Sequence, residues 1–112
     1  MAGIIRRLAG PLALTNTLTT NIFVPPSSAV DAIVRHIHVV NKTGGAVTFS
    51  LWLGATGANA AGTELFNGQS VASNSTFDYY CAMRMASTDF LVGGASAGTS
   101  LTIEIEGENV AV

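Results

Sequence analysis

Two histidines in the run AIVRHIHVV, His36 and His38, are the residues whose types and spacing could most directly do chemistry. In an extended strand they project from the same face, roughly 6 to 7 Å apart, which is near enough to share a metal ion. A metal site needs a third ligand, and no spacing in the sequence indicates one. We therefore interpret the pair as polar residues on an outward strand face and expect neither a metal nor a cofactor.

Other reactive residue types occur without the pattern that catalysis needs. Ser, His and Asp are all present, but no Gly-x-Ser-x-Gly elbow marks a nucleophile. Cys81 alternates with apolar residues, which predicts a buried structural thiol. Glu104, Glu106 and Glu108 share one face of the last strand; we interpret them as a solvated face, since a glycosidase pair would need a partner across a cleft. We therefore expect no enzyme.

The strands that carry these residues alternate with a period of two. Residues 31–41 and 46–54 are apolar, β-branched runs joined by Asn-Lys-Thr-Gly-Gly, which predicts a long antiparallel hairpin. The first run places Ile33, Ile37 and Val39 opposite the histidines. The second places its apolar residues opposite a polar face: Val47, Phe49, Leu51 and Leu53 against Thr48, Ser50 and Trp52.

Short strands separated by Gly, Asn and Pro turns continue along the chain. Asn67-Gly68 is typical of a tight hairpin turn, and the sequence predicts no helix. The pattern predicts an all-β, single-domain antiparallel β-sandwich of the jelly-roll kind at 14–112, preceded by an extended N-terminal arm at 1–13. The further strands are expected at residues 21–24, 65–66, 69–71, 75–85, 89–92 and 100–107.

The chain is poor in charge. Only 11% of its 112 residues are charged and the net charge is −2, whereas an ordinary soluble domain has about 25% charged residues. Phosphate binding needs clustered Lys and Arg, so we expect no nucleic acid partner. No apolar run approaches the roughly 18 residues that span a membrane, so we expect no membrane partner. The surface must be covered by small polar residues or be hidden in subunit contacts.

Two large aromatic residues, Trp52 and Tyr80, have the parity of an outward face. Exposed aromatics of this kind commonly anchor interfaces. Val34 and Val40 share the parity of the histidines and would extend an apolar patch. Alternatively, this face is buried in the second sheet or under a loop.

The N-terminal arm combines apolar and basic residues: Ile4, Ile5, Arg6, Arg7 and Leu8. Such a segment becomes ordered when it docks on a partner. Alternatively, it is a strand or a tail of the same domain.

Several segments of the chain match a known pattern: TNTLTTNIFVPP, then AIVRHIHVVNKTGGAVTFSLWLG, then GTELFNG and SVASNSTFD. Together they cover about residues 15–107 and resemble the small β-sandwich virion proteins of tailed bacteriophages. The resemblance implies a capsid decoration (cement), head-fibre or tail-associated subunit, commonly oligomeric, and supplies no catalytic residues.

Composition, arm and resemblance together predict a non-enzymatic phage structural protein. We expect it to be made in the host bacterial cytoplasm and to lie on the capsid surface of the virion. Its expected partners are further copies of itself, in a homotrimer, and the major capsid protein, whose subunits it would bridge. The alternative is a receptor- or glycan-binding module of a tail or head fibre, in which Trp52 or Tyr80 stacks on a sugar. A small hydrolase is a third and weaker interpretation.

Overall fold

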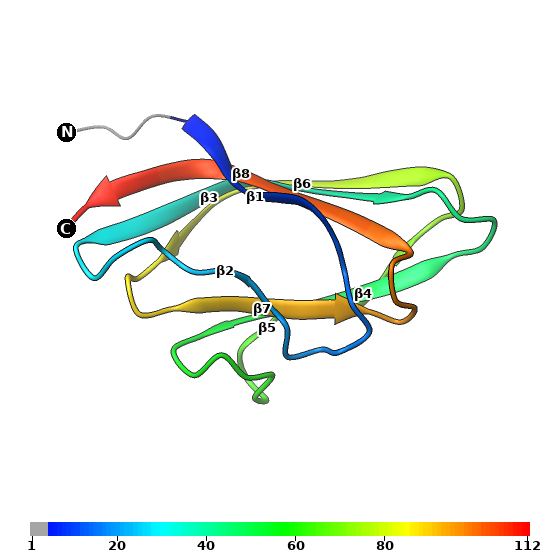
Figure 1. Ribbon diagram of the computed structural model, residues 1–112, viewed down its shortest axis with the longest axis horizontal. Coiled ribbons are helices and arrows are strands. Elements are labelled where there is room, and N and C mark those ends of the chain that lie inside the picture. Colours follow the sequence, from blue (N-terminus) through cyan, green and yellow to red (C-terminus); the bar gives the residue numbers. More distant parts are fainter. Residues whose placement is uncertain (1–4) are drawn as a thin grey trace.

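The computed structural model describes residues 5–112, which form two antiparallel four-stranded sheets packed face to face (Figure 1). The sheet orders are β1-β8-β3-β6 and β2-β7-β4-β5. Pairing β1 with β8, β2 with β7, β3 with β6 and β4 with β5 is the result of rolling up one long double strand, as in a jelly roll. The predicted all-β sandwich is therefore confirmed. The strands are β1 (Ile5–Ala13), β2 (Asn21–Phe23), β3 (Val30–Asn41), β4 (Val47–Gly54), β5 (Glu64–Val71), β6 (Ser75–Met85), β7 (Phe90–Ala95) and β8 (Leu101–Ala111).

The predicted hairpin between residues 31–41 and 46–54 is wrong. β3 pairs with β6 and β8, whereas β4 pairs with β5 and β7. Their connection therefore crosses between sheets, and Figure 1 shows β3 in the upper sheet and β4 in the lower one. Both strands alternate because each has one face against the core. Alternation is the same for neighbours in one sheet and for strands that face each other across a sandwich.

The tight turn predicted at Asn67-Gly68 is also wrong. Both residues lie inside the continuous strand β5, which carries one extra residue relative to β4 at this point. Gly68 has a positive φ of 68°, a conformation that suits glycine in a β-bulge. Its N–H donates a hydrogen bond to Ser50 Oγ at 2.9 Å. The dipeptide therefore bends a strand rather than reversing the chain.

The hydrophobic core lies between the two sheets. Its side chains come from the inward positions of strands whose alternation the sequence already displays, chiefly β3, β4 and β8. Burial of these alternating apolar residues is the main force that holds one sheet against the other. The fully buried members include Ile37, Val39, Phe49, Leu51, Leu101, Ile103 and Ile105.

β3 changes the parity of its faces at Arg35. Between Val34 and His36, β3 has one residue more than β8, so Arg35 is an extra residue in a β-bulge relative to β8, whereas on the other side β6 has the extra residue relative to β3. Val34 consequently points into the core and is fully buried, and Ile33 lies half-buried on the outer face. The predictions that Val34 faces outward and Ile33 inward are wrong. Arg35 Nε donates to Glu108 at 2.8 Å, which buries a carboxylate expected on a solvated face.

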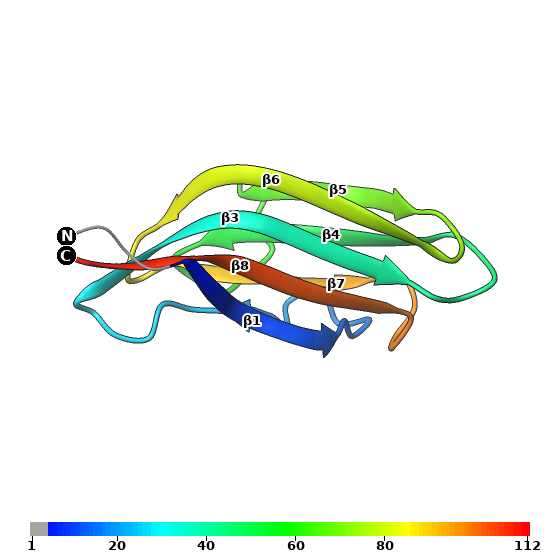
Figure 2. The same ribbon diagram turned by 90° about the horizontal axis from the view of Figure 1, so that it is seen from above.

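Residues 5–13 form β1, an edge strand of the first sheet that pairs with β8 (Figure 2). The segment interpreted as an N-terminal arm is therefore a strand of the same domain, which was the alternative interpretation. Leu8 and Leu12 are half-buried and pack against the core. Ile4 lies outside the described residues. Within residues 5–112, no helix has the length and apolar character needed to cross a membrane.

Candidate functional site

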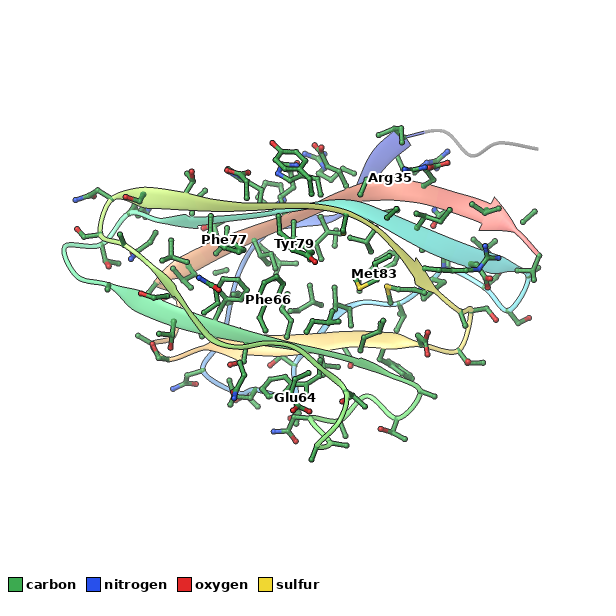
Figure 3. The ribbon with its side chains drawn as sticks, turned by 180° about the vertical axis from the view of Figure 1, so that it is seen from behind. Arg35, Glu64, Phe66, Phe77, Tyr79 and Met83 are labelled. Atoms are coloured by element: carbon green, nitrogen blue, oxygen red, sulfur yellow. The ribbon has the colours of Figure 1, made fainter. Side chains whose placement is uncertain are left out.

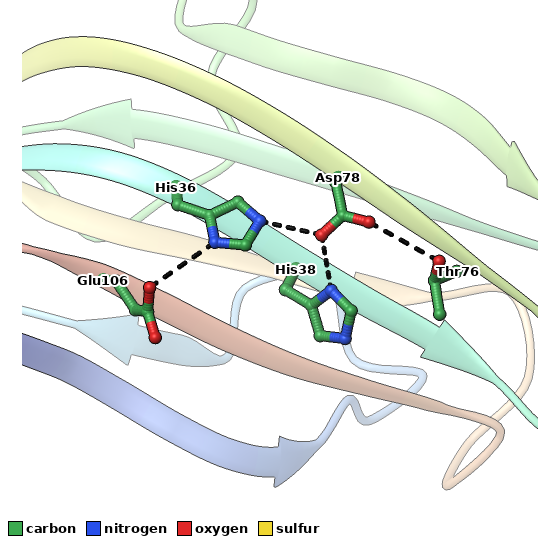
Figure 4. Close-up of polar contacts among 5 residues, drawn as sticks. All are labelled: His36, His38, Thr76, Asp78 and Glu106. Carbon is green, nitrogen blue, oxygen red and sulfur yellow. Dashed lines mark hydrogen bonds and ion pairs between the residues drawn. The ribbon is translucent and has the colours of Figure 1, made fainter.

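A cluster of two histidines and one aspartate occupies the outer face of the first sheet. The bulge at Arg35 puts His36 and His38 on this face, and the register places Asp78 of β6 directly opposite His38. His36 Nε2 and His38 Nδ1 donate to the same oxygen, Asp78 Oδ1, at 2.7 and 2.5 Å (Figure 4). We call His36, His38 and Asp78 the His-Asp-His cluster.

Neighbouring side chains orient the His-Asp-His cluster. Tyr80 stacks on the His36 ring with centroids 4.3 Å apart and planes 3° apart. Glu106 Oε1, on β8, lies 3.5 Å from the other nitrogen of that ring, His36 Nδ1. Thr76 Oγ1 lies 3.5 Å from Asp78 Oδ2. Each ring and the carboxylate thus contact side chains from rigid strands rather than from loops.

Hydrogen bonds from His38, and then from His36, lower the pKa of the Asp78 carboxyl. The physical cause is that both N–H groups stabilise the ionised oxygen they share. The side chains are 18% (His36), 31% (His38) and 32% (Asp78) exposed, so solvent reaches the cluster. The arrangement offers two imidazole nitrogens and a carboxylate within 4.8 Å of one another.

Asp78 is the member of the candidate site that sequence reasoning missed. The alternation of residues 75–85 already placed Asp78 on an outward face, but its partner strand was unknown. Only the pairing of β3 with β6 brings it opposite His38. The third member of the cluster, which the spacing of His36 and His38 did not reveal, therefore lies 40 residues from His38 in the sequence.

The side of the sandwich between the edge strands β5 and β6 is apolar and partly open. The rings of Phe66, Phe77 and Tyr79 pack edge to face there, with centroids 5.1 Å (Phe66–Tyr79) and 5.6 Å (Phe66–Phe77) apart. Beside them lies a groove of about 260 Å³ that Met83 and Cys81 also line. Figure 3 shows Phe66, Phe77, Tyr79 and Met83 between the two sheets. We call this surface the β5–β6 side.

Cys81 is half-buried and packs against the core. Its Sγ contacts the carbonyl oxygen of Val34 at 3.2 Å, and burial raises the pKa of the thiol. A thiol with a raised pKa is a poor nucleophile at neutral pH. Cys81 also faces the interior of the sandwich, whereas His36 lies on the outer face, so the two do not meet.

The predicted exposure of Trp52 is wrong, because the side chain is only 6% exposed. Trp52 does point away from the core between the sheets. However, the connection between β4 and β5 folds beneath this face of the second sheet (Figure 1), and Gly57 lies against Phe90 on β7. The alternative interpretation, in which this face is buried under a loop, therefore fits Trp52 better. Trp52 is no longer a candidate surface anchor.

Tyr80 is 74% exposed on the outer face of the first sheet, as its alternation predicted. Val40 shares this face and is half-buried. Ile5, Arg6 and Arg7 are exposed along β1. The surviving candidate surface residues thus form two groups on the first sheet, one around Tyr80 and one on β1.

Comparisons of the chain with protein-family models, curated proteins and solved structures found no match.

Proposed function

We propose that this chain is a non-enzymatic structural subunit of a tailed-bacteriophage virion, an oligomeric decoration (cement) protein that bridges neighbouring capsid subunits. The observation that carries the proposal is the β5–β6 side. It leaves large aromatic side chains partly exposed between two edge strands, and Tyr79 is 43% exposed there. A surface of this kind gains most from being covered by another protein.

The low charge of the chain supports the same proposal. With 11% charged residues, the surface has few ionic groups to favour solvation over contact with another subunit. Edge strands with free hydrogen-bonding groups also pair readily with a neighbour. In a trimer, the β5–β6 side of each copy would be covered by the next copy, which leaves the outer face and β1 for the capsid.

Replacing Tyr79 by serine is expected to weaken self-association at least tenfold, because truncating an aromatic anchor commonly costs 2 kcal/mol or more. Native mass spectrometry over a concentration series measures the effect. Val24→Ser is the matched control, since Val24 is 41% exposed but lies on the opposite side, near β1 and β2. A wild-type chain that stays monomeric, alone and on capsids, would refute the trimer.

Replacing Arg6 and Arg7 together by alanine is expected to lower occupancy on phage capsids about tenfold. Each exposed charge contributes up to about 1 kcal/mol, and the losses of the copies linked in one oligomer add up. Cosedimentation with capsids assembled without the chain provides the measurement. The point variants are preferable to deleting the arm, because β1 contributes Leu8 and Leu12 to the packing of the core.

Lys42→Ala serves as the control for this double variant, because Lys42 lies in the connection after β3, at the far end of the sheet from the start of β1 (Figure 2). Unchanged occupancy of the Arg6/Arg7 variant would show that β1 makes no capsid contact. Failure of the wild-type chain to bind any capsid would remove the decoration proposal itself.

The second candidate is a glycan- or receptor-binding module of a fibre, and the exposure of Tyr80 favours it. One face of the Tyr80 ring stacks on His36, and carboxylates lie nearby, a combination that suits a sugar ring and its hydroxyl groups. A glycan array separates the candidates. A decoration protein should bind capsids and no glycan on the array. A fibre module should bind a glycan, and the Tyr80→Ala variant should lose that binding.

A further inference from the structure

We propose that His36, His38 and Asp78 form a binding site for a divalent transition-metal ion of the zinc class. Two imidazole nitrogens and one carboxylate are a donor set that Zn²⁺ uses widely, with three protein ligands and a fourth position left for water. Mg²⁺ and Ca²⁺ prefer sites made of oxygen atoms, so they fit this cluster less well. The inference is independent of the proposed virion role.

The geometry carries the inference because the three donor atoms converge. His36 Nε2 and His38 Nδ1 both point at Asp78 Oδ1, from 2.7 and 2.5 Å. On metal binding, each neutral imidazole would carry its proton on its other ring nitrogen, and the freed His36 Nε2 and His38 Nδ1 lone pairs would bind one ion together with Asp78. The donor atoms lie within 4.8 Å of one another, so small rotations of exposed side chains bring them to the spacing of a shared ion.

The surroundings match those of metal-binding histidines. A ligating histidine commonly has its second ring nitrogen held by a carboxylate, which fixes the ring orientation and raises its basicity. His36 has this arrangement, since Nδ1 lies 3.5 Å from Glu106 Oε1 while Nε2 faces Asp78. Tyr80 holds the plane of the same ring by stacking.

The charge of the face also favours a cation. Asp78 and Glu106 flank His36, and Glu104 pairs in register with His38 on β8. All these residues lie on β3, β6 and β8, which are neighbours in one sheet. The site is therefore held by strands and needs no ordering of a loop on binding, which limits its entropic cost.

Isothermal titration calorimetry of the full chain with ZnCl₂ near neutral pH tests the site. We expect one Zn²⁺ per chain, with Mg²⁺ binding at least a hundredfold more weakly. His38→Gln and Asp78→Asn should each weaken Zn²⁺ binding at least tenfold, and Glu106→Gln about tenfold. Glu64→Gln, on the other sheet, and Cys81→Ser should leave the affinity unchanged.

A second readout uses Co²⁺ in place of Zn²⁺. Strong visible absorption from a low-symmetry, nitrogen- and oxygen-ligated Co²⁺ is expected in the wild type and is expected to disappear in the His36→Gln/His38→Gln variant. If that double variant fails to fold, Asp78→Asn takes its place. Absence of stoichiometric Zn²⁺ uptake by the wild type, or equal affinity in these variants, would overturn the site.

Discussion

Replacing Asn41 by alanine is expected to lower the free energy of unfolding by about 3 kcal/mol. Asn41 is fully buried where β3 ends and the chain crosses to the second sheet. Its Nδ2 donates to the carbonyl oxygens of Gly45 and Val71 at 2.9 and 3.0 Å, and its Oδ1 accepts from Thr43. Removing the side chain takes this partner from the Val71 carbonyl oxygen and the Thr43 N–H, whereas the Gly45 carbonyl oxygen can still accept from Thr43 Oγ1 at 2.9 Å. Each group left unpaired and buried costs about 1–3 kcal/mol, and the cavity left by the side chain adds to the loss. Urea denaturation measures the change.

Asn67→Ala is the matched control for Asn41→Ala, because Asn67 is exposed on β5. We expect it to change the free energy of unfolding by less than about 0.5 kcal/mol. A loss of less than about 1 kcal/mol for Asn41→Ala would contradict the proposed importance of the hydrogen bond by which Asn41, on β3, joins Val71 on β5 of the other sheet. The expected loss of about 3 kcal/mol is a large part of the total, because domains of this size are stable by only about 5–15 kcal/mol.

Asn41 also illustrates why a short motif is weak evidence by itself. Asn41-Lys42-Thr43 has the form of a glycosylation acceptor. In the folded chain the Asn41 side chain is buried and uses both its oxygen and its nitrogen. Thr43 Oγ1 donates to Asn41 Oδ1 at 2.7 Å. The spacing of Asn and Thr therefore serves the crossing between the sheets.

The faces of most strands could be predicted from the sequence, whereas their partners could not. Alternation records which side chains of a strand meet the core, and it correctly placed Phe49 and Ile37 inside and Tyr80 outside. It carries no information on which strand lies beside which, so β3 and β4 were wrongly paired. In a jelly roll, most partners are distant in the chain, and the pairs are chosen by the packing of the whole sandwich.

The bulge at Arg35 shows a second limit of alternation. One extra residue exchanges the two faces of a strand, so Val34 and His36 lie on opposite faces although they are two residues apart. The apolar or polar character of single residues did not reveal the bulge. Part of its explanation is the ion pair between Arg35 and Glu108, which join only after β3 and β8 are neighbours.

Only the two histidines of the candidate metal site could be predicted from the sequence. His36 and His38 share a face of one strand, and this feature is local. Asp78 and Glu106 come from the two neighbouring strands, so their part in the cluster depends on register. Trp52 was misplaced for a related reason, since it is buried on the face of the second sheet beneath which the connection between β4 and β5 folds (Figure 1). Loops rich in Gly and Ala give little indication of where they will fold.

Replacing Phe49 by alanine is expected to have the largest effect, a loss of about 3–5 kcal/mol in the free energy of unfolding. Phe49 is 1% exposed at the centre of the core, and its ring lies 5.4 Å from that of Phe66 and 5.5 Å from that of Phe77. Truncating a buried phenylalanine removes apolar burial and leaves a cavity that the sheets cannot fully close. Chemical denaturation followed by circular dichroism gives the value.

Phe66→Ala is the comparison variant, because Phe66 touches the same ring but is only half-buried at the β5–β6 side. We expect it to cost about 1–2 kcal/mol, since less area returns to water.

The two variants also differ in their expected effect on assembly. Phe66→Ala removes a ring from the surface proposed for self-association, so it should weaken the oligomer even where the monomer stays folded. Phe49→Ala acts through stability, so it should spare the oligomer below its unfolding transition. Equal destabilisation by both substitutions would mean that Phe49 is not the centre of the core.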